Sequence, residues 1–264
     1  MSAAVIIPCY KEKLSPTELV SLEQCLKILH NYPIILAIPN DMNDISYRAV
    51  FEKNKVTFQS VSFDNLFFKN IESYNRLMLD LDFYEKFLTF DYILIYQLDA
   101  FVFKDELDFW CSKDYDYVGS PWVNYPKNHS NLKVFVTWYF YSKVFQTLSK
   151  FFKFSDKYLI VYGVRGSVGN GGFSLRKVNS FVKCLQEINE NKLHSDYLKK
   201  FRYNEDAFWS LWAKKYYNLK IPIATEANFF ALEYPTKKDI AKNIPFGCHA
   251  WDEDISLWNK IIDL

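Results

Sequence analysis

Acidic side chains that could bind a ligand or move a proton stand in two short stretches of the sequence. Asp99 interrupts an apolar run in residues 92–103 (YILIYQLDAFVF), and Glu205-Asp206 precedes a run of aromatic residues. A continuous apolar run predicts a strand buried on both faces. Because ligands in open α/β sheets bind beyond the carboxyl ends of strands, Asp99 is either a ligand-site acid or a structural acid that caps the next turn. The second pair has a structural alternative too, since acids at a helix start favour the helix dipole.

Glycines are concentrated in residues 163–176 (GVRGSVGNGGFSLR), which hold five of the chain's seven. Such density allows unusual φ angles and a close approach of the backbone to a ligand. A tight turn before the next strand would need only one or two of them. Arg165 and Arg176 flank the run, and both are candidate phosphate partners because arginine binds phosphate in a bidentate manner.

Two other residues have both a functional and a structural interpretation. Arg76 lies in the first turns of a helix predicted over residues 71–87. Helix N-termini attract anions, so Arg76 either reaches a phosphate or is an ordinary surface arginine. His249, in PFGCHAW near the C-terminus, is one of four histidines. A lone histidine among aromatic residues is normally a core residue, and the alternative is a ligand-binding role.

Composition narrows the class of protein. The 264 residues carry a net charge of +1 and are 50% hydrophobic and 24% charged, so we expect a globular domain without nucleic-acid partners. The five cysteines are scattered and form no CxxC, which argues against a zinc site or a disulfide framework and indicates a reducing compartment. The N-terminal stretch lacks the features of a signal peptide. We therefore expect a cytoplasmic protein, with the inner face of the bacterial membrane as the alternative location.

The first sixty residues alternate between strand and helix patterns. Buried-type strands are predicted at residues 5–7, 34–38 and 56–61, with a helix at 46–53 and another that starts with a capping box at Ser15-Pro16-Thr17-Glu18. This spacing is typical of a doubly wound, mostly parallel sheet with helices on both faces. No GxGxxG follows the first strand, so a dinucleotide-binding fold is not expected.

One later segment has a different character. Residues 132–154 place aromatic and aliphatic side chains at helical spacing, with lysines between them. Such a helix either packs its aromatic stripe on the sheet or lies on an anionic membrane as a peripheral contact. A polar stretch at residues 124–131 precedes it. We expect a single domain (residues 1–264) with a boundary there between residues 1–121 and residues 122–264.

Five motifs, VIIPCY, YQLDAFVF, GNGGFSLR, NEDAFW and FGCHAW, occur in this order over most of the chain. Together they resemble nucleotide-sugar glycosyltransferases of the GT-A fold, and in particular an uncharacterised bacterial family associated with surface polysaccharide synthesis. The resemblance implies a donor half (1–121), an acceptor and catalytic half (122–264), and transfer of a hexose from a nucleotide sugar to a hydroxyl of a glycan or lipid-linked glycan. A non-catalytic carbohydrate-binding relative and a retaining transferase are the alternatives.

The same resemblance implies a donor site. In GT-A enzymes the loop after the first strand holds the nucleotide base, and the acids of a DxD motif hold a divalent metal. Here Phe101 stands in place of the second acid, and Gln97-Leu98-Asp99 forms a QxD variant. A late histidine often completes the metal site, so Asp99 and His249 are the implied ligands for Mn²⁺ or Mg²⁺. The implied donor-binding residues are Pro8, Cys9, Tyr10, Arg76, Gln97, Asp99, Arg165, Asn170, Gly171, Gly172, Arg176 and Trp251.

A Gly-Gly loop followed by an acidic pair at a helix start is similar to the order in inverting GT-A enzymes. There, one carboxylate takes the proton of the acceptor hydroxyl, which requires hydrogen-bond reach. The resemblance implies Asp206 as the base, with Glu205 orienting or binding the acceptor. In a retaining enzyme no such base is needed, and Asp206 would be structural. In a metal-independent enzyme, arginines would hold the diphosphate instead.

Overall fold

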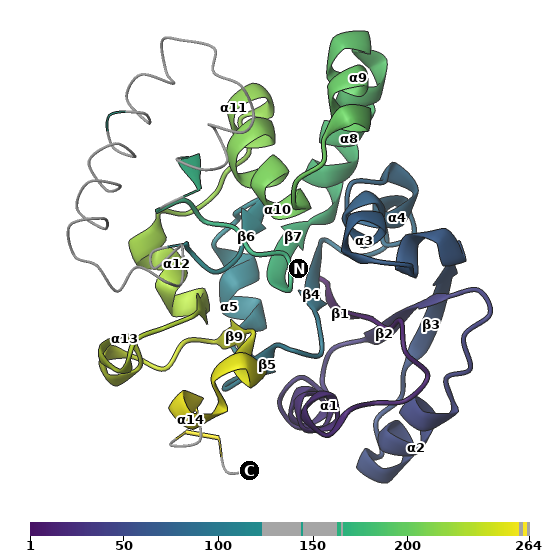
Figure 1. Ribbon diagram of the computed structural model, residues 1–264, viewed down its shortest axis with the longest axis vertical. Helices are drawn as coiled ribbons and strands as arrows, with labels where there is room; N and C mark the ends of the chain where they lie inside the picture. Colours follow the sequence, from purple (N-terminus) through teal and green to yellow (C-terminus); the bar gives the residue numbers. More distant parts are fainter. Residues whose placement is uncertain (123–143, 145–162, 165, 259–260, 263–264) are drawn as a thin grey trace.

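Six strands form the central sheet in the computed structural model, which describes residues 1–122, 144, 163–164, 166–258 and 261–262 (Figure 1). Their order is β3-β2-β1-β4-β7-β6. The strands are β1 (Ala3–Pro8), β2 (Ile34–Pro39), β3 (Gln59–Phe63), β4 (Tyr92–Tyr96), β6 (Tyr117–Val118) and β7 (Phe173–Lys177). The first four run parallel, and β7 runs antiparallel between β4 and β6. The predicted α/β class with a mostly parallel sheet is confirmed.

The apolar runs become the central strands because both of their faces are covered. Every residue of β1 and β4 is buried. Side chains alternate between the two faces of a strand, so Val5 and Ile7 join one core while Ala4 and Ile6 join the other. The third strand begins later than the predicted 56–61, because its pairing with β2 begins at Ile35 and Gln59.

Helices cover both faces of the sheet. One core takes residues from α1 (Pro16–Ile28), α2 (Ile45–Asn54), α5 (Leu107–Ser112) and α12 (Ala224–Phe230). The other core takes residues from α3 (Ile71–Leu77), α4 (Leu81–Glu85), α8 (Val178–Glu190) and η2 (Phe208–Ala213). The pair α1 and α2 and the pair α8 and α9 (Lys192–Lys200) lie on opposite sides of the sheet (Figure 1). The predicted doubly wound arrangement is confirmed.

Helix starts follow local capping chemistry. The predicted capping box of α1 is present, since Ser15 accepts from the Glu18 backbone and Glu18 accepts from the Ser15 backbone. The prediction of a single helix over residues 71–87 is wrong. Asp80 accepts from the backbone of Asp82 and starts α4 as a separate helix after α3. The helix after Asn204 is also divided, into α10 (Glu205–Ala207), the π-helical η2 and α11 (Lys214–Tyr217).

A smaller second sheet lies beside the first, in the order β5-β9-β8. Its strands are β5 (Phe101–Val102), β8 (Ala231–Glu233) and β9 (Gly247–His249). The chain therefore passes from β4 in one sheet to β5 in the other, and Asp99 lies in that short connection. The remaining elements are η1 (Asn65–Phe68), α13 (Lys237–Lys242), η3 (Trp251–Asp254) and α14 (Ile255–Trp258).

The predicted basic helix at residues 132–154 and the preceding stretch 124–131 fall outside the described residues, with the exception of Val144. Among the residues that are described, no helix is both long and apolar enough to cross a membrane.

Candidate active site

A cavity of about 930 Å³ opens beyond the carboxyl ends of β1 and β4. This is the edge at which parallel sheets bind ligands. Most of the residues implied by the sequence motifs line it, although they come from five separate segments. These residues are Pro8, Cys9, Tyr10, Gln97, Asp99, Asn170, Gly171, Gly172, Glu205, Asp206 and His249.

Asp99, Gln97 and His249 meet on one wall of the cavity. The Nε2 atom of His249 lies 3.2 Å from Oδ1 of Asp99 and 3.3 Å from Oε1 of Gln97. The pairing of β5 with β9 sets this arrangement, because Phe101 is the register partner of Cys248. The Asp99 oxygen is buried, and the His249 ring is the group beside it. Two side-chain oxygens thus lie next to Nε2 of the imidazole.

The other edge of the imidazole is also occupied by polar groups. Nδ1 of His249 lies 2.9 Å from Nδ2 of Asn170 and 3.3 Å from Oε1 of Glu233. Burial opposes a charged imidazole, but the carboxylates of Asp99 and Glu233 outweigh it and raise the pKa of His249 to about 10. Burial likewise raises the pKa of Asp99, and the nearby His249 reverses this, so that the net pKa is lowered.

These donors fit a divalent cation that displaces the proton from Nε2, because a histidine binds a metal in its neutral form. Adjacent ligands of an octahedral ion with bonds of about 2.1 Å lie about 3 Å apart, close to the separations around Nε2. Manganese accepts imidazole as well as oxygen ligands, and a carboxylate behind the ring, here Glu233, is the usual orienting partner of a ligating histidine. The described residues contain no cluster of three or more His, Cys, Asp or Glu side chains able to hold a metal. The third donor in this set is instead the neutral amide of Gln97.

The Gly171-Gly172 pair separates this wall from the acidic pair. A Cβ on Gly172 would lie 2.1 Å from Nε2 of His249, and a Cβ on Gly171 would lie 2.1 Å from Oε1 of Glu205. Both positions therefore exclude any larger residue in this arrangement. Asn170, which precedes them, has a φ of 73° and accepts a hydrogen bond from the Gly172 backbone. Asparagine tolerates this left-handed conformation better than most residues.

Asp206 lies on the opposite side of the glycine pair. Its carboxylate accepts hydrogen bonds from the backbone of Gly171 (3.3 Å) and of Ala207 (2.6 Å). Burial, followed by the charges of Glu205 and Glu233, raises the pKa of Asp206 to about 7. A carboxyl group with this pKa is suited to accept a proton near neutral pH.

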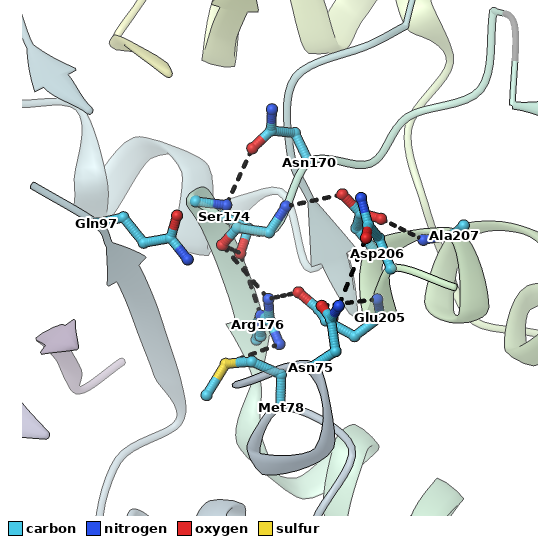
Figure 2. Close-up of polar contacts among 12 residues, drawn as sticks. Asn75, Met78, Gln97, Asn170, Ser174, Arg176, Glu205, Asp206 and Ala207 are labelled. Atoms are coloured by element: carbon cyan, nitrogen blue, oxygen red, sulfur yellow. Dashed lines mark hydrogen bonds and ion pairs between the residues drawn. The ribbon is translucent and has the colours of Figure 1, made fainter. Parts of the chain in front are cut away.

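Arg176, a predicted phosphate partner, has a different place in the structure. It is completely buried and does not line the cavity. Its guanidinium donates to Oε1 of Glu205 at 2.7 Å (Figure 2) and to the Tyr84 hydroxyl at 2.7 Å. The sequence interpretation is corrected here, because these internal partners use the donors that a phosphate would need.

Two other expected donor-binding residues also differ from their prediction, and a third is not described. Arg76 lies outside the cavity lining and donates to the backbone carbonyls of Leu198 and Phe201. Trp251 is buried against Phe101 and does not line the cavity, so it does not close the pocket. Arg165 falls outside the described residues.

Several lining residues were not expected from the sequence. Glu233 is the register partner of His249 on the parallel strand β8, a relationship that only the pairing of the two short strands reveals. Asn75, on α3, accepts a hydrogen bond from the Glu205 backbone at 3.2 Å and so holds the start of α10. Cationic side chains also reach the cavity, namely Lys11, Lys69 and Arg202. No motif signalled them, because isolated basic residues are common on any surface.

Comparisons with known proteins agree with this fold. The galactosyltransferase LgtC, solved with donor and acceptor sugar analogs, superimposes with a TM-score of 0.51 at 11% identity, over 98% of this chain and 100% of that one. Core-mannan synthase A of Aspergillus fumigatus, solved in a Mn/GDP form, gives a TM-score of 0.47 at 12% identity over 80% and 68%. The Streptococcus pneumoniae glycosyltransferase GlyE gives 0.48 at 10% over 99% and 60%. The likeness to LgtC shows that the fold is GT-A-like.

The family itself is defined by sequence. A family model described as "Protein of unknown function (DUF5672)" matches residues 57–249, and the chain belongs to this family. No curated protein matches the sequence. The matched span contains Asp99, the glycine loop, Asp206 and His249, and it ends at the last of these.

Proposed function

We propose that the protein is a glycosyltransferase that moves a hexose from a nucleotide-sugar donor to a hydroxyl of a glycan or lipid-linked glycan. One observation carries the proposal. A convergent Gln97, Asp99 and His249 set and a separate carboxylate of raised pKa, Asp206, line one cavity on two sides of a glycine pair. A sugar transferase needs these two parts, one for the leaving diphosphate and one for the incoming hydroxyl.

The donor occupies the part of the cavity nearest β1 in this proposal. The nucleotide base lies against Pro8, Cys9 and Tyr10, which line the cavity where β1 ends. Asp99 and His249, with the Gln97 amide, would hold Mn²⁺ or Mg²⁺, which would supply charge stabilisation for the leaving diphosphate. Lys69, which lines the cavity, binds the phosphates in place of Arg76 and Arg176.

The acceptor enters beside Asp206. The acceptor oxygen forms a bond to the anomeric carbon while the bond from that carbon to the diphosphate oxygen breaks. Asp206 takes the hydroxyl proton, and the nucleoside diphosphate leaves with the bonding electron pair. Attack from the face opposite the leaving group inverts the anomeric configuration. The donor half remains residues 1–121 and the acceptor half residues 122–264, with His249 reaching back to the donor.

The expected location is the cytoplasm. All five cysteines are buried and free, as is usual for proteins of a reducing compartment.

Donor binding can be tested by thermal unfolding with a panel of nucleoside diphosphates, each with and without Mn²⁺. Ligands that bind the native state raise the melting temperature. We expect one nucleotide to give a clearly larger shift with Mn²⁺ than without it, and Asp99→Ala to remove the Mn²⁺-dependent part. The exposed aspartate variant Asp196→Asn is the matched control. If no nucleotide shifts the wild-type protein, the proposal fails.

The stereochemical part has a separate test. Proton NMR of the glycoside product, compared with the donor sugar, shows whether the anomeric configuration is inverted or retained. An inverted anomer supports Asp206 as the base. A retained anomer keeps the transferase function but assigns Asp206 a structural role, which is the alternative mechanism.

A further inference from the structure

Arg176 is a charged residue buried beneath the floor of the cavity, with no exposed surface. Its guanidinium donates to Glu205 and Tyr84, both at 2.7 Å, and its Nε donates to the Ser174 hydroxyl at 3.1 Å. The rings of Tyr117 and Phe181 lie against the same group. Arginine does not lose its proton in proteins, so this site holds a permanent positive charge.

Glu205 supplies the compensating negative charge. Its side chain is 3% exposed, and its Oε1 faces Nη2 of Arg176. Burial raises the pKa of Glu205, while the adjacent Arg176 acts against this effect. An unpaired buried arginine would be strongly destabilising, so the pair is ionised in the native state. The charge of Glu205 is therefore fixed at a position next to Asp206 in the chain.

Two sets of contacts connect this pair to Asp206 (Figure 2). The first runs through the chain itself, because Glu205 directly precedes Asp206. The second runs through Ser174, whose hydroxyl accepts from Arg176 and donates to the Gly171 carbonyl at 3.0 Å. The Gly171 backbone N–H then donates to Oδ2 of Asp206 at 3.3 Å. Arg176 thus contacts Glu205, the residue before Asp206, and through Ser174 it reaches Gly171, one of the two backbone donors to the Asp206 carboxylate.

We propose that the buried Arg176–Glu205 pair positions Asp206 and strengthens it as a proton acceptor. The Glu205 charge disfavours a second negative charge beside it, so Asp206 holds a proton more tightly. The charged or titratable groups that face Asp206 are Glu205, Glu233 on β8 and Tyr117 on β6. Glu205 has the largest electrostatic effect among them. The catalytic meaning of this inference rests on the proposed function, whereas the acidity of Asp206 can be measured without it.

The direct test is a carbon-13 NMR titration of protein labelled at the aspartate carboxyl groups, in the absence of divalent metal. The Asp206 signal is assigned by its loss in Asp206→Asn. We expect a midpoint near 7 in the wild type, and a decrease of about one pH unit or more in Glu205→Gln. Glutamine keeps the oxygen that accepts from Arg176 but removes the charge. An unchanged midpoint in a folded Glu205→Gln protein would overturn the proposal.

Two further variants separate charge from position. The double variant Arg176→Met/Glu205→Met replaces the buried pair by apolar groups, which buried sites often tolerate. We expect a smaller decrease in the Asp206 midpoint than in Glu205→Gln, because the positive charge is removed together with the nearer negative charge. Arg176→Lys keeps a cation beside Glu205 but lacks the forked geometry. We expect it to keep the raised midpoint and to lower kcat at least tenfold. A double variant that folds and titrates like the wild type would contradict the proposal.

The outcomes also distinguish this inference from the proposed function. If the protein transfers no sugar but the Asp206 midpoint decreases in Glu205→Gln, the proposed function is refuted and the proposed effect of the pair on Asp206 stands. If the enzyme is active but its Asp206 midpoint is unchanged in Glu205→Gln, the proposed effect of the pair is refuted and the proposed function stands.

Discussion

Asp99 and His249 lie 3.2 Å apart through Oδ1 and Nε2, although one follows a strand of the central sheet and the other ends a strand of the second sheet. The small β5-β9-β8 sheet is what brings them together. Its strands have two or three residues each, and Phe101, Leu232 and Cys248 from the three strands share a separate hydrophobic cluster. We infer that the sheet also places His249 and Glu233 at the carboxyl edge of β4.

The first prediction concerns the metal ligands. His249→Ala should raise the Mn²⁺ concentration needed for half-maximal activity at least tenfold while nucleotide binding persists. Asp99→Ala should raise this Mn²⁺ concentration further, because it removes the one charged oxygen donor of the Gln97, Asp99 and His249 set. Activity measured against Mn²⁺ concentration, with calorimetry for nucleotide binding, checks both, and the exposed-histidine variant His30→Ala is the control. Full activity in excess chelator would contradict a role for the metal.

The second prediction concerns the space that the glycine pair provides. A Cβ on Gly172 would meet the ring of His249 at 2.1 Å and the Gln97 oxygen at 2.8 Å. Gly172→Ala should therefore displace the ring and reduce turnover by about a hundredfold, the effect of a small misplacement at a reacting centre. Because the displaced atoms belong to side chains, the melting temperature should change little.

Gly163→Ala is the matched control for that substitution. Among the residues that the structure describes, its Cβ would meet only the Leu211 side chain, at an ordinary contact distance of 3.4 Å. Steady-state kinetics and thermal unfolding of both variants provide the comparison. Equal turnover in the two would show that the glycine pair has no special spacing role.

Much of this arrangement was predictable from the sequence. The central strands follow from the continuous apolar runs, and the start of α1 follows from its capping box. The motif order also predicted that Asp99, the glycine loop, Asp206 and His249 share one site, and all of them line the cavity.

Other features were not predictable, for physical reasons. Arg176 sits in a strand, and a sequence does not show which face an alternating side chain takes. Here the residue points into the core beneath the cavity, which required the internal partners Glu205 and Tyr84. The sequence did not indicate Glu233, because its position beside His249 depends on the register of β8 and β9. The division of the helix at residues 71–87 was missed because its apolar pattern continues across the break at Asp80.

The third prediction concerns pH. Asp206 must be ionised to accept a proton, and burial together with Glu205 and Glu233 raises its pKa to about 7. The value of kcat/KM should therefore rise with pH through about 7 and level off above it. A pH–rate profile of the free enzyme measures this directly. A plateau that already begins near pH 5 would show that Asp206 is not the limiting base.

The same raised pKa has a consequence for stability. The folded protein holds the Asp206 proton more tightly than the unfolded chain, whose aspartates titrate near 3.9. This contribution is fully present below pH 4 and is lost as pH rises through about 7. Asp206→Asn should therefore melt at a temperature equal to or above that of the wild type at pH 8. A clear decrease in the melting temperature would contradict the claim that burial disfavours the ionised Asp206 carboxylate in the folded protein.

The fourth prediction concerns Lys69, which is exposed and lines the cavity. If it binds the diphosphate, Lys69→Ala should weaken nucleotide-diphosphate binding by about three- to tenfold, and the effect should shrink as salt is added. The α8 variant Lys183→Ala, in which an exposed lysine pairs with Glu187, is the control. Unchanged affinity at low salt would remove Lys69 from the donor site.

The central claim is that this cavity transfers sugar with Asp206 as the base. The most direct measurement is the release of nucleoside diphosphate from a panel of nucleotide sugars with Mn²⁺ and candidate glycan acceptors. The wild type and the exposed-surface variant Asp196→Asn should release it at the same rate in the presence of one donor. Asp206→Asn should bind that donor equally well but release diphosphate about a hundredfold more slowly or worse. Undiminished release by Asp206→Asn would contradict the account.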